Sequence, residues 1–97
     1  MLTVKLAACG NPDFGQSTGP LPGIPRRTVE VKDLAEASAV CLRFIAEHDL
    51  GVGNWAGGEV RDGRKKIVAR VSYNGRVWPP GKWWLGMEPL LEPASRR

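Results

Sequence analysis

The chain has 97 residues, a net charge of +4 at pH 7, 42% hydrophobic residues and 25% charged residues. This size and composition are typical of one small domain, predicted over residues 1–97, and no apolar run approaches the roughly 20 residues of a membrane-spanning helix. The two cysteines do not make a disulfide framework, and free thiols suit a cytoplasmic location.

Leu2, Val4 and Leu6 alternate with polar residues, which predicts a first strand with one buried face. The following letters, LAAC at residues 6–9, match the cleavage box of bacterial lipoproteins. In a lipoprotein signal an apolar run precedes this box, and here the charged Lys5 lies where that run would have to be. We therefore expect a strand here and no export signal.

Residues 10–25 contain four glycines and four prolines. No helix or strand is expected to cross such a segment, so it is predicted to be a long loop. Long loops are usually functional or mobile. The alternative is an ordered loop that packs Phe14 and Leu21 against the core, and the sequence leaves both open.

A second strand is predicted over residues 27–31, and the one clear helix over residues 32–49. Asp33 and Glu36 have the spacing of a capping box at the start of the helix. Gly51 suits the left-handed residue that ends it. The apolar stripe of the helix is predicted to contain Leu34, Ala37, Val40, Cys41, Phe44 and Ile45.

Residues 51–58 hold four glycines around Asn54 and Trp55. A phosphate-cradling loop follows a strand and opens a helix, whereas this segment follows a helix and opens a strand. We interpret it as a flexible corner with Trp55 as a lid on the core.

Two turn signals, Asp62-Gly63 and Asn74-Gly75, predict an antiparallel meander. Its strands are expected at residues 58–61, 64–73 and 76–78. With two-residue turns, Val60 lies opposite Lys65 and Trp78 opposite Val71. The face toward the helix then holds Val60, Ile67, Ala69, Val71, Tyr73 and Trp78. The open face holds Glu59, Arg61, Arg64, Lys66, Val68, Arg70, Ser72 and Val77.

Residues 61–97 carry nine basic and three acidic side chains. This excess of positive charge is compatible with electrostatic binding of nucleic acid by the open face. The alternative is that the charges only keep a solvated face soluble. The expected anion contacts are Arg61, Arg64, Lys66, Arg70 and Arg76. Nucleic-acid binders add aromatic platforms on the open face, and the predicted register places Tyr73 and Trp78 on the covered face instead.

Residues 79–97 form a predicted irregular tail rich in tryptophan. Its large apolar side chains either close the core or meet another chain, and tryptophan and methionine are enriched at protein interfaces. A homodimer through this tail is one form of the second alternative. The expected protein-contact residues are Trp83, Trp84, Leu85 and Met87 of the tail, with Phe14 of the long loop.

Catalysis is not expected, because the single histidine, His48, lies at the predicted helix end, where it favours the helix dipole. Cys41 shares a helix face with His48 but lies two turns away, beyond hydrogen-bond reach. Two cysteines and one histidine are also too few for a zinc site, and no cofactor is expected.

The sequence therefore predicts an α+β fold, with a single helix packed on a mostly antiparallel sheet in the order β-β-α-β-β-β. The function expected is a small non-catalytic binding module that acts through protein–protein contacts, with nucleic-acid binding as the alternative. In size and lack of catalytic motifs the chain is similar to small accessory or inhibitor proteins of phages and mobile elements. This similarity is one of type, and no residue motif supports it.

Overall fold

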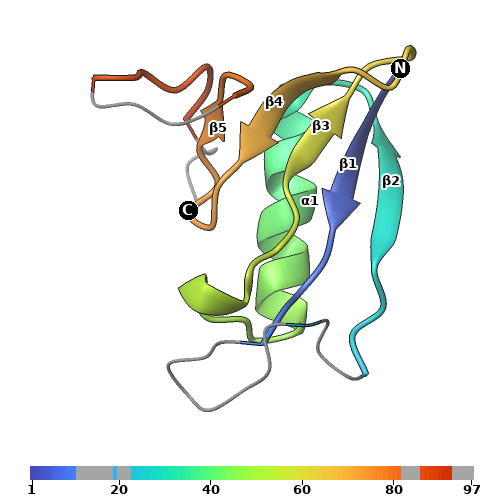
Figure 1. Cartoon of the computed structure of the whole chain (residues 1–97), viewed down its shortest axis with the longest axis vertical. Helices are drawn as coiled ribbons and strands as arrows, with labels where there is room; N and C mark the ends of the chain where they lie inside the picture. Colours follow the sequence, from blue (N-terminus) through green and yellow to red (C-terminus); the bar gives the residue numbers. More distant parts are fainter. Residues whose placement is uncertain (11–18, 20–22, 82–85, 93–97) are drawn as a thin grey trace.

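The computed structural model describes residues 1–10, 19, 23–81 and 86–92. One α-helix packs against a five-stranded antiparallel sheet with the strand order β2-β1-β3-β4-β5 (Figure 1). This confirms the predicted α+β fold. In chain order the elements are β1 Leu2–Leu6, β2 Arg27–Val31, α1 Leu34–Glu47, the 3-10 helix η2 Val52–Asn54, β3 Glu59–Arg61, β4 Ile67–Val71 and β5 Val77–Trp78.

Strand β1 lies between β2 and β3, so both of its edges are paired. Leu2 faces Val31, and Val4 faces Val29 across the β1–β2 pair. Because side chains alternate across a strand, these residues share the face that α1 covers. The polar residues between them point to the other face, which we call the open face of the sheet.

Helix α1 begins at Leu34, two residues later than predicted, and the predicted Asp33 cap is confirmed: its carboxylate accepts a hydrogen bond from the Glu36 N–H at 2.8 Å. The Glu36 carboxylate accepts from the Lys32 N–H at 2.7 Å and not from Asp33, so the predicted capping box is not completed. The predicted ending at Gly51 is wrong, because Asp49 adopts the left-handed conformation with φ 51°. The chain reverses there so that Leu50 enters the core, where its N–H donates to the Ile45 carbonyl at 3.0 Å. Within the described residues, no helix has both the length and the apolar character needed to span a bilayer.

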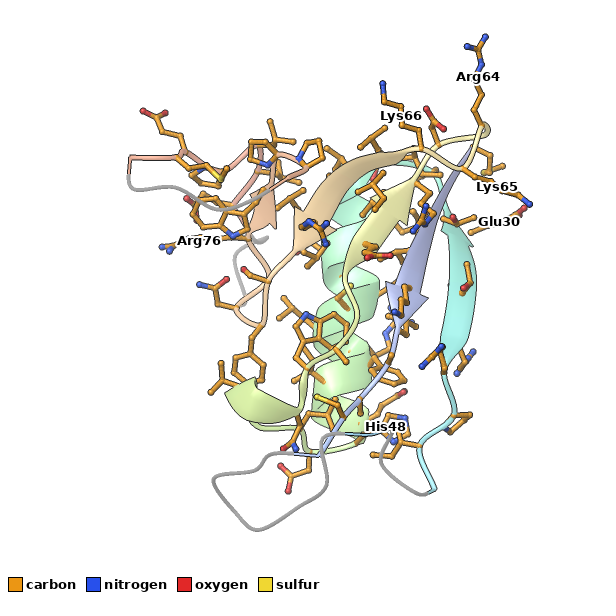
Figure 2. All side chains as sticks on the ribbon, viewed as in Figure 1. Glu30, His48, Arg64, Lys65, Lys66 and Arg76 are labelled. Carbon is orange, nitrogen blue, oxygen red and sulfur yellow. The ribbon has the colours of Figure 1, made fainter. Side chains whose placement is uncertain are left out.

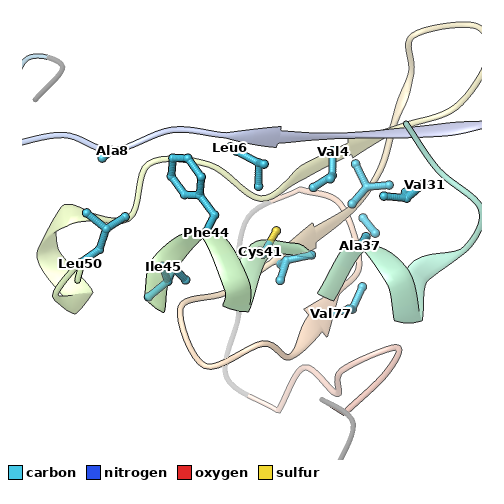
Figure 3. Close-up of a cluster of buried hydrophobic side chains, with 13 residues drawn as sticks. Val4, Leu6, Ala8, Val31, Ala37, Cys41, Phe44, Ile45, Leu50 and Val77 are labelled. Atoms are coloured by element: carbon cyan, nitrogen blue, oxygen red, sulfur yellow. The ribbon is translucent and has the colours of Figure 1, made fainter. Parts of the chain in front are cut away.

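The core lies between α1 and the covered face of the sheet (Figure 3). It joins the predicted helix stripe to Val4, Leu6 and Val31 from the first two strands. Ser38 is the buried polar side chain of the described residues, and its hydroxyl donates to the Gly75 carbonyl at 2.6 Å. This bond ties α1 to the turn before β5, and it satisfies a carbonyl that would otherwise be buried without a partner.

The first hairpin turn is longer than the predicted two residues, so the pairing of Val60 with Lys65 is wrong. Val60 instead faces Ala69, and a register shift follows before Arg61 faces Ile67. The turn is closed by the Asp62 carboxylate, which accepts backbone hydrogen bonds from Arg64 at 2.8 Å and from Lys66 at 3.0 Å. These local bonds offer the backbone an alternative to the strand ladder, and they lower the pKa of the Asp62 carboxyl.

The second hairpin turn is longer than predicted by one residue. The Ser72 N–H donates to the Arg76 carbonyl at 2.9 Å, so three residues, 73–75, form the loop, with Gly75 at φ 89°. Val71 therefore faces Val77, and Arg70 faces Trp78. A shift of one residue moves every side chain of a strand to the opposite face. The predicted placement of Val77 and Trp78 is thus reversed, and Val77 is the fully buried residue.

Candidate binding surface

The cations expected to share one basic face lie in three separate places, and Figure 2 shows Arg64 and Lys66 apart from Arg76. Arg64 and Lys66 lie with Lys65 on the tip of the first hairpin, before β4 begins at Ile67. Arg61 and Arg70 remain on the sheet, where both contact the Glu59 carboxylate at 3.1 and 3.6 Å. Arg76 lies in the second hairpin, just before β5.

Arg76 lies just before β5 and pairs with Glu92 at 2.8 Å. This ion pair joins the second hairpin to the described part of the tail. Arg64 and Lys66 thus lie off the sheet face on which they were expected, and the other three expected anion contacts each pair with Glu59 or Glu92. Arg64, Lys65 and Lys66 follow each other in the chain at the hairpin tip, and all three are exposed.

Trp78 lies on the open face opposite Arg70, as a consequence of the three-residue turn. Its indole N–H donates to the Ser72 hydroxyl oxygen at 3.1 Å, and the side chain is partly buried. The Arg70 side chain is 44% exposed. A two-residue turn at Asn74-Gly75 would place Trp78 on the covered face, so this juxtaposition could be predicted only from a three-residue loop with glycine in its last position.

Trp55 enters the same region from the glycine-rich segment after α1. Its indole N–H donates to the Val71 carbonyl at 3.0 Å, and its ring lies 6.1 Å from the Phe44 ring between centroids. Trp55 therefore packs on the core, as the sequence predicted. The segment expected to be a flexible corner is hydrogen-bonded to the first strand and the residues after it: the Ala56 N–H donates to the Ala7 carbonyl, and the Gly58 N–H donates to the Lys5 carbonyl.

A groove of about 270 Å³ separates the two indoles. We call it the tryptophan groove. It is lined by Trp55, Gly57, Arg70, Val71, Ser72, Trp78, Pro79, Gly81 and Met87. Both indole N–H groups bond to atoms of the protein, so the rings contribute apolar surface and the Arg70 guanidinium contributes positive charge at the rim.

Met87 is the expected protein-contact residue that the structure places in this groove, where it is half-buried. The other four expected protein-contact residues, Phe14, Trp83, Trp84 and Leu85, lie outside the described residues. They remain predictions from the sequence. Near Met87, the described part of the tail also has Leu90, which is 51% exposed, and Leu91, which pairs with Val77.

The residues with nucleophilic or acid–base chemistry do not form a cluster in the described part of the chain. His48 caps the end of α1 and packs its ring on Phe44, with centroids 4.6 Å apart. Cys41 is fully buried in the core. Among the described residues, no group of three or more histidine, cysteine, aspartate or glutamate side chains is placed to hold a metal ion.

Cys41 and Cys9 are expected to differ in reactivity. Burial raises the pKa of the Cys41 thiol to about 12, so almost none of it is the reactive thiolate at pH 8. Cys9 is only half-buried. With a disulfide reagent at pH 8, we expect one fast reaction at Cys9, and reaction of Cys41 only after denaturant is added. Equal rates at both thiols in the folded protein would contradict the buried position of Cys41.

Comparison of the chain with protein-family models, with curated proteins and with solved structures found no match. The interpretation of the tryptophan groove therefore depends on its own geometry.

Proposed function

We propose that the protein is a non-catalytic binding module whose tryptophan groove receives a segment of a partner protein. The observation that carries the proposal is the pairing of two indoles with Met87 around a groove of about 270 Å³. Tryptophan and methionine are enriched in protein interfaces, and tryptophan is frequent among the residues that dominate their binding energy. The volume is suited to one or two large apolar side chains.

Arg70 would give the groove its selectivity. Its guanidinium lies 3.6 Å from Glu59, and Glu59 also pairs with Arg61 at 3.1 Å, so one carboxylate serves two cations. A second carboxylate, supplied by the partner, would complete this arrangement. We therefore expect a bound segment to combine a large apolar residue with a nearby aspartate or glutamate.

Selection from a library of random peptides displayed on phage tests this proposal. We expect enriched peptides to share an apolar residue close to an acidic one. Their affinity should fall about tenfold or more in Trp78→Ala and in Arg70→Glu, because hot-spot side chains commonly contribute more than 1.4 kcal/mol.

Arg64→Glu is the matched control for Arg70→Glu, because it makes the same charge change on the hairpin tip, away from the groove. It should leave peptide affinity unchanged. An equal loss in both charge variants would indicate a general electrostatic effect. Failure to enrich any peptide, or peptides that bind Trp78→Ala as tightly as the unaltered protein, would reject the proposal.

A second candidate function is the binding of single-stranded nucleic acid. The observation that favours it is Trp78 opposite Arg70 on the open face. Single-strand binders combine cations with aromatic rings on which bases stack. The hairpin tip, with Arg64, Lys65 and Lys66, would then contact phosphates.

Fluorescence anisotropy of a labelled oligothymidylate measures this second function. Binding should weaken steeply as salt rises, since phosphate contacts release counterions. Trp78→Ala should remove the stacking contribution, and a double Arg64→Ala, Lys66→Ala variant should reduce the salt dependence. No anisotropy change at low salt would exclude nucleic-acid binding and leave the protein-binding proposal in place.

A further inference from the structure

The two edge strands of the sheet, β5 and β2, differ in whether their outer backbone groups are covered. At β5 the edge is covered: the Val77 N–H donates to the Leu91 carbonyl at 2.8 Å, and Pro79 and Pro80 end the strand. At β2 the five residues Arg27–Val31 pair with β1 on one side, and no described element lies on the other side (Figure 1). Natural proteins usually protect such an edge with proline, a bulge or a covering segment.

The register decides which backbone groups of β2 point away from the sheet. The carbonyls of Lys5 and Ala7 accept hydrogen bonds from Gly58 and Ala56, so these residues direct their backbone groups away from β2. In an antiparallel ladder, the residue facing Lys5 then belongs to a pair without hydrogen bonds. That residue is Thr28, and Glu30 is in the same phase.

Thr28 and Glu30 therefore present two N–H groups and two carbonyls at the free edge. The described residues provide no hydrogen-bond partner for these four groups. Between them, Val29 points to the helix side, where it lines a hollow of about 190 Å³ with Val40 and Phe44. The edge thus offers a backbone ladder beside a hollow whose lining is partly apolar and also includes Arg27, Arg43 and Glu47.

We propose that this edge binds a second copy of the same chain, with β2 pairing antiparallel to β2 around a two-fold axis at Val29. This register pairs all five residues of the strand. Thr28 faces Glu30 of the second copy, twice, which gives four backbone hydrogen bonds. Val29 faces Val29 on the helix side, and the two five-stranded sheets become one continuous sheet of ten strands.

The charges near the edge have both signs in this register, and just outside the paired strands Arg26 of one copy faces Lys32 of the other, a like-charge pair. Arg26, just before β2, is exposed and lies diagonal to Glu30 of the second copy, within the range at which cross-strand pairs interact. Neither Arg26 nor Glu30 belongs to an ion pair in the described part of the chain. The facing Thr28 hydroxyl can also donate to the same carboxylate. Each Glu30 thereby gains two partners.

Sedimentation equilibrium over a concentration series tests the dimer. The unaltered protein, of 10.6 kDa, should approach twice this mass as concentration rises. The association is expected to be weak, because a single strand pair buries less surface than a stable interface. In amide NMR spectra, the resonances of Thr28 and Glu30 should shift with concentration more than those of β3.

Thr28→Pro removes the outward N–H together with the side-chain hydroxyl, and proline is tolerated on an edge where the missing donor faces solvent. It should weaken self-association by about tenfold or more, because two hydrogen bonds are lost per dimer. Thr28→Val keeps the N–H and is the matched control, with self-association expected to remain. Glu30→Arg should also weaken the dimer, and adding Arg26→Glu should restore it.

A chain that stays monomeric at millimolar concentration overturns the proposal. So does a dimer that Thr28→Pro and Glu30→Arg leave unchanged, which would assign the contact to another surface such as the tail. If Thr28→Pro fails to fold by circular dichroism, the charge reversal at Glu30 and its rescue by Arg26→Glu decide the question. An NMR shift confined to residues of the tryptophan groove also counts against the β2 edge.

Discussion

Replacing Val77 with aspartate is expected to unfold the protein, whereas the same change at the neighbouring Trp78 is expected to leave it folded. Val77 is 0% exposed and packs in the core, so the variant would bury a carboxyl group without a partner. This costs about 4 kcal/mol or more, close to the whole stability of many small domains, which is about 5–15 kcal/mol. Thermal unfolding followed by circular dichroism measures the difference.

Trp78→Asp is the matched comparison, because Trp78 lies on the open face beside Arg70. We expect a loss of about 1–2 kcal/mol from the removed ring contacts, with a cooperative transition retained. The register assumed from the sequence, with Trp78 buried and Val77 exposed, gives the opposite order. A more stable Val77→Asp than Trp78→Asp would therefore contradict the three-residue turn.

Gly58→Val is the second substitution with a large expected effect. Gly58 has φ 104°, a conformation that side chains strongly disfavour, and a Cβ atom there would overlap the Val71 carbonyl oxygen. The Gly58 carbonyl also accepts the Val71 N–H at 2.8 Å, so the two backbones cannot separate without breaking a bond. We expect a loss of about 3 kcal/mol or more, read from the midpoint of urea unfolding.

Gly63→Val is the control for this change. Gly63 lies in the first hairpin turn, has no positive φ, and would place a Cβ atom in open space. Its effect on the urea midpoint should be within about 0.5 kcal/mol. Because Val71 also carries the carbonyl that binds the Trp55 indole, Gly58→Val should alter Trp55 fluorescence. Equal midpoints for the two variants would mean that Gly58 does not make this close approach.

The sequence by itself determined the elements and most of the core. Alternating apolar residues gave β1 and β2 their exact bounds, and the stripe of α1 with its Asp33 cap predicted the helix to within two residues at each end. These features depend on local spacing and on side chains that bond to their own backbone. Alternation within their own strands also predicted the buried face of Val4 and Val71, whereas Val60 was placed on that face through the assumed two-residue turn.

Only the tertiary structure decided the turns, and with them the candidate site. In both hairpins the glycine-containing pair was compatible with turns of different length, and the choice came from burial of Val77 and from the hydrogen bonds of Ser38 and Asp62. The tip cations lie off the sheet because the first turn is longer than predicted and β4 begins at Ile67. Trp78 lies beside Arg70 because one residue of register in the second hairpin reverses the side chains of β5. The alternation of side chains along a strand is a local property. Which of the two alternating sets faces the core is decided by contacts with residues far away in the chain.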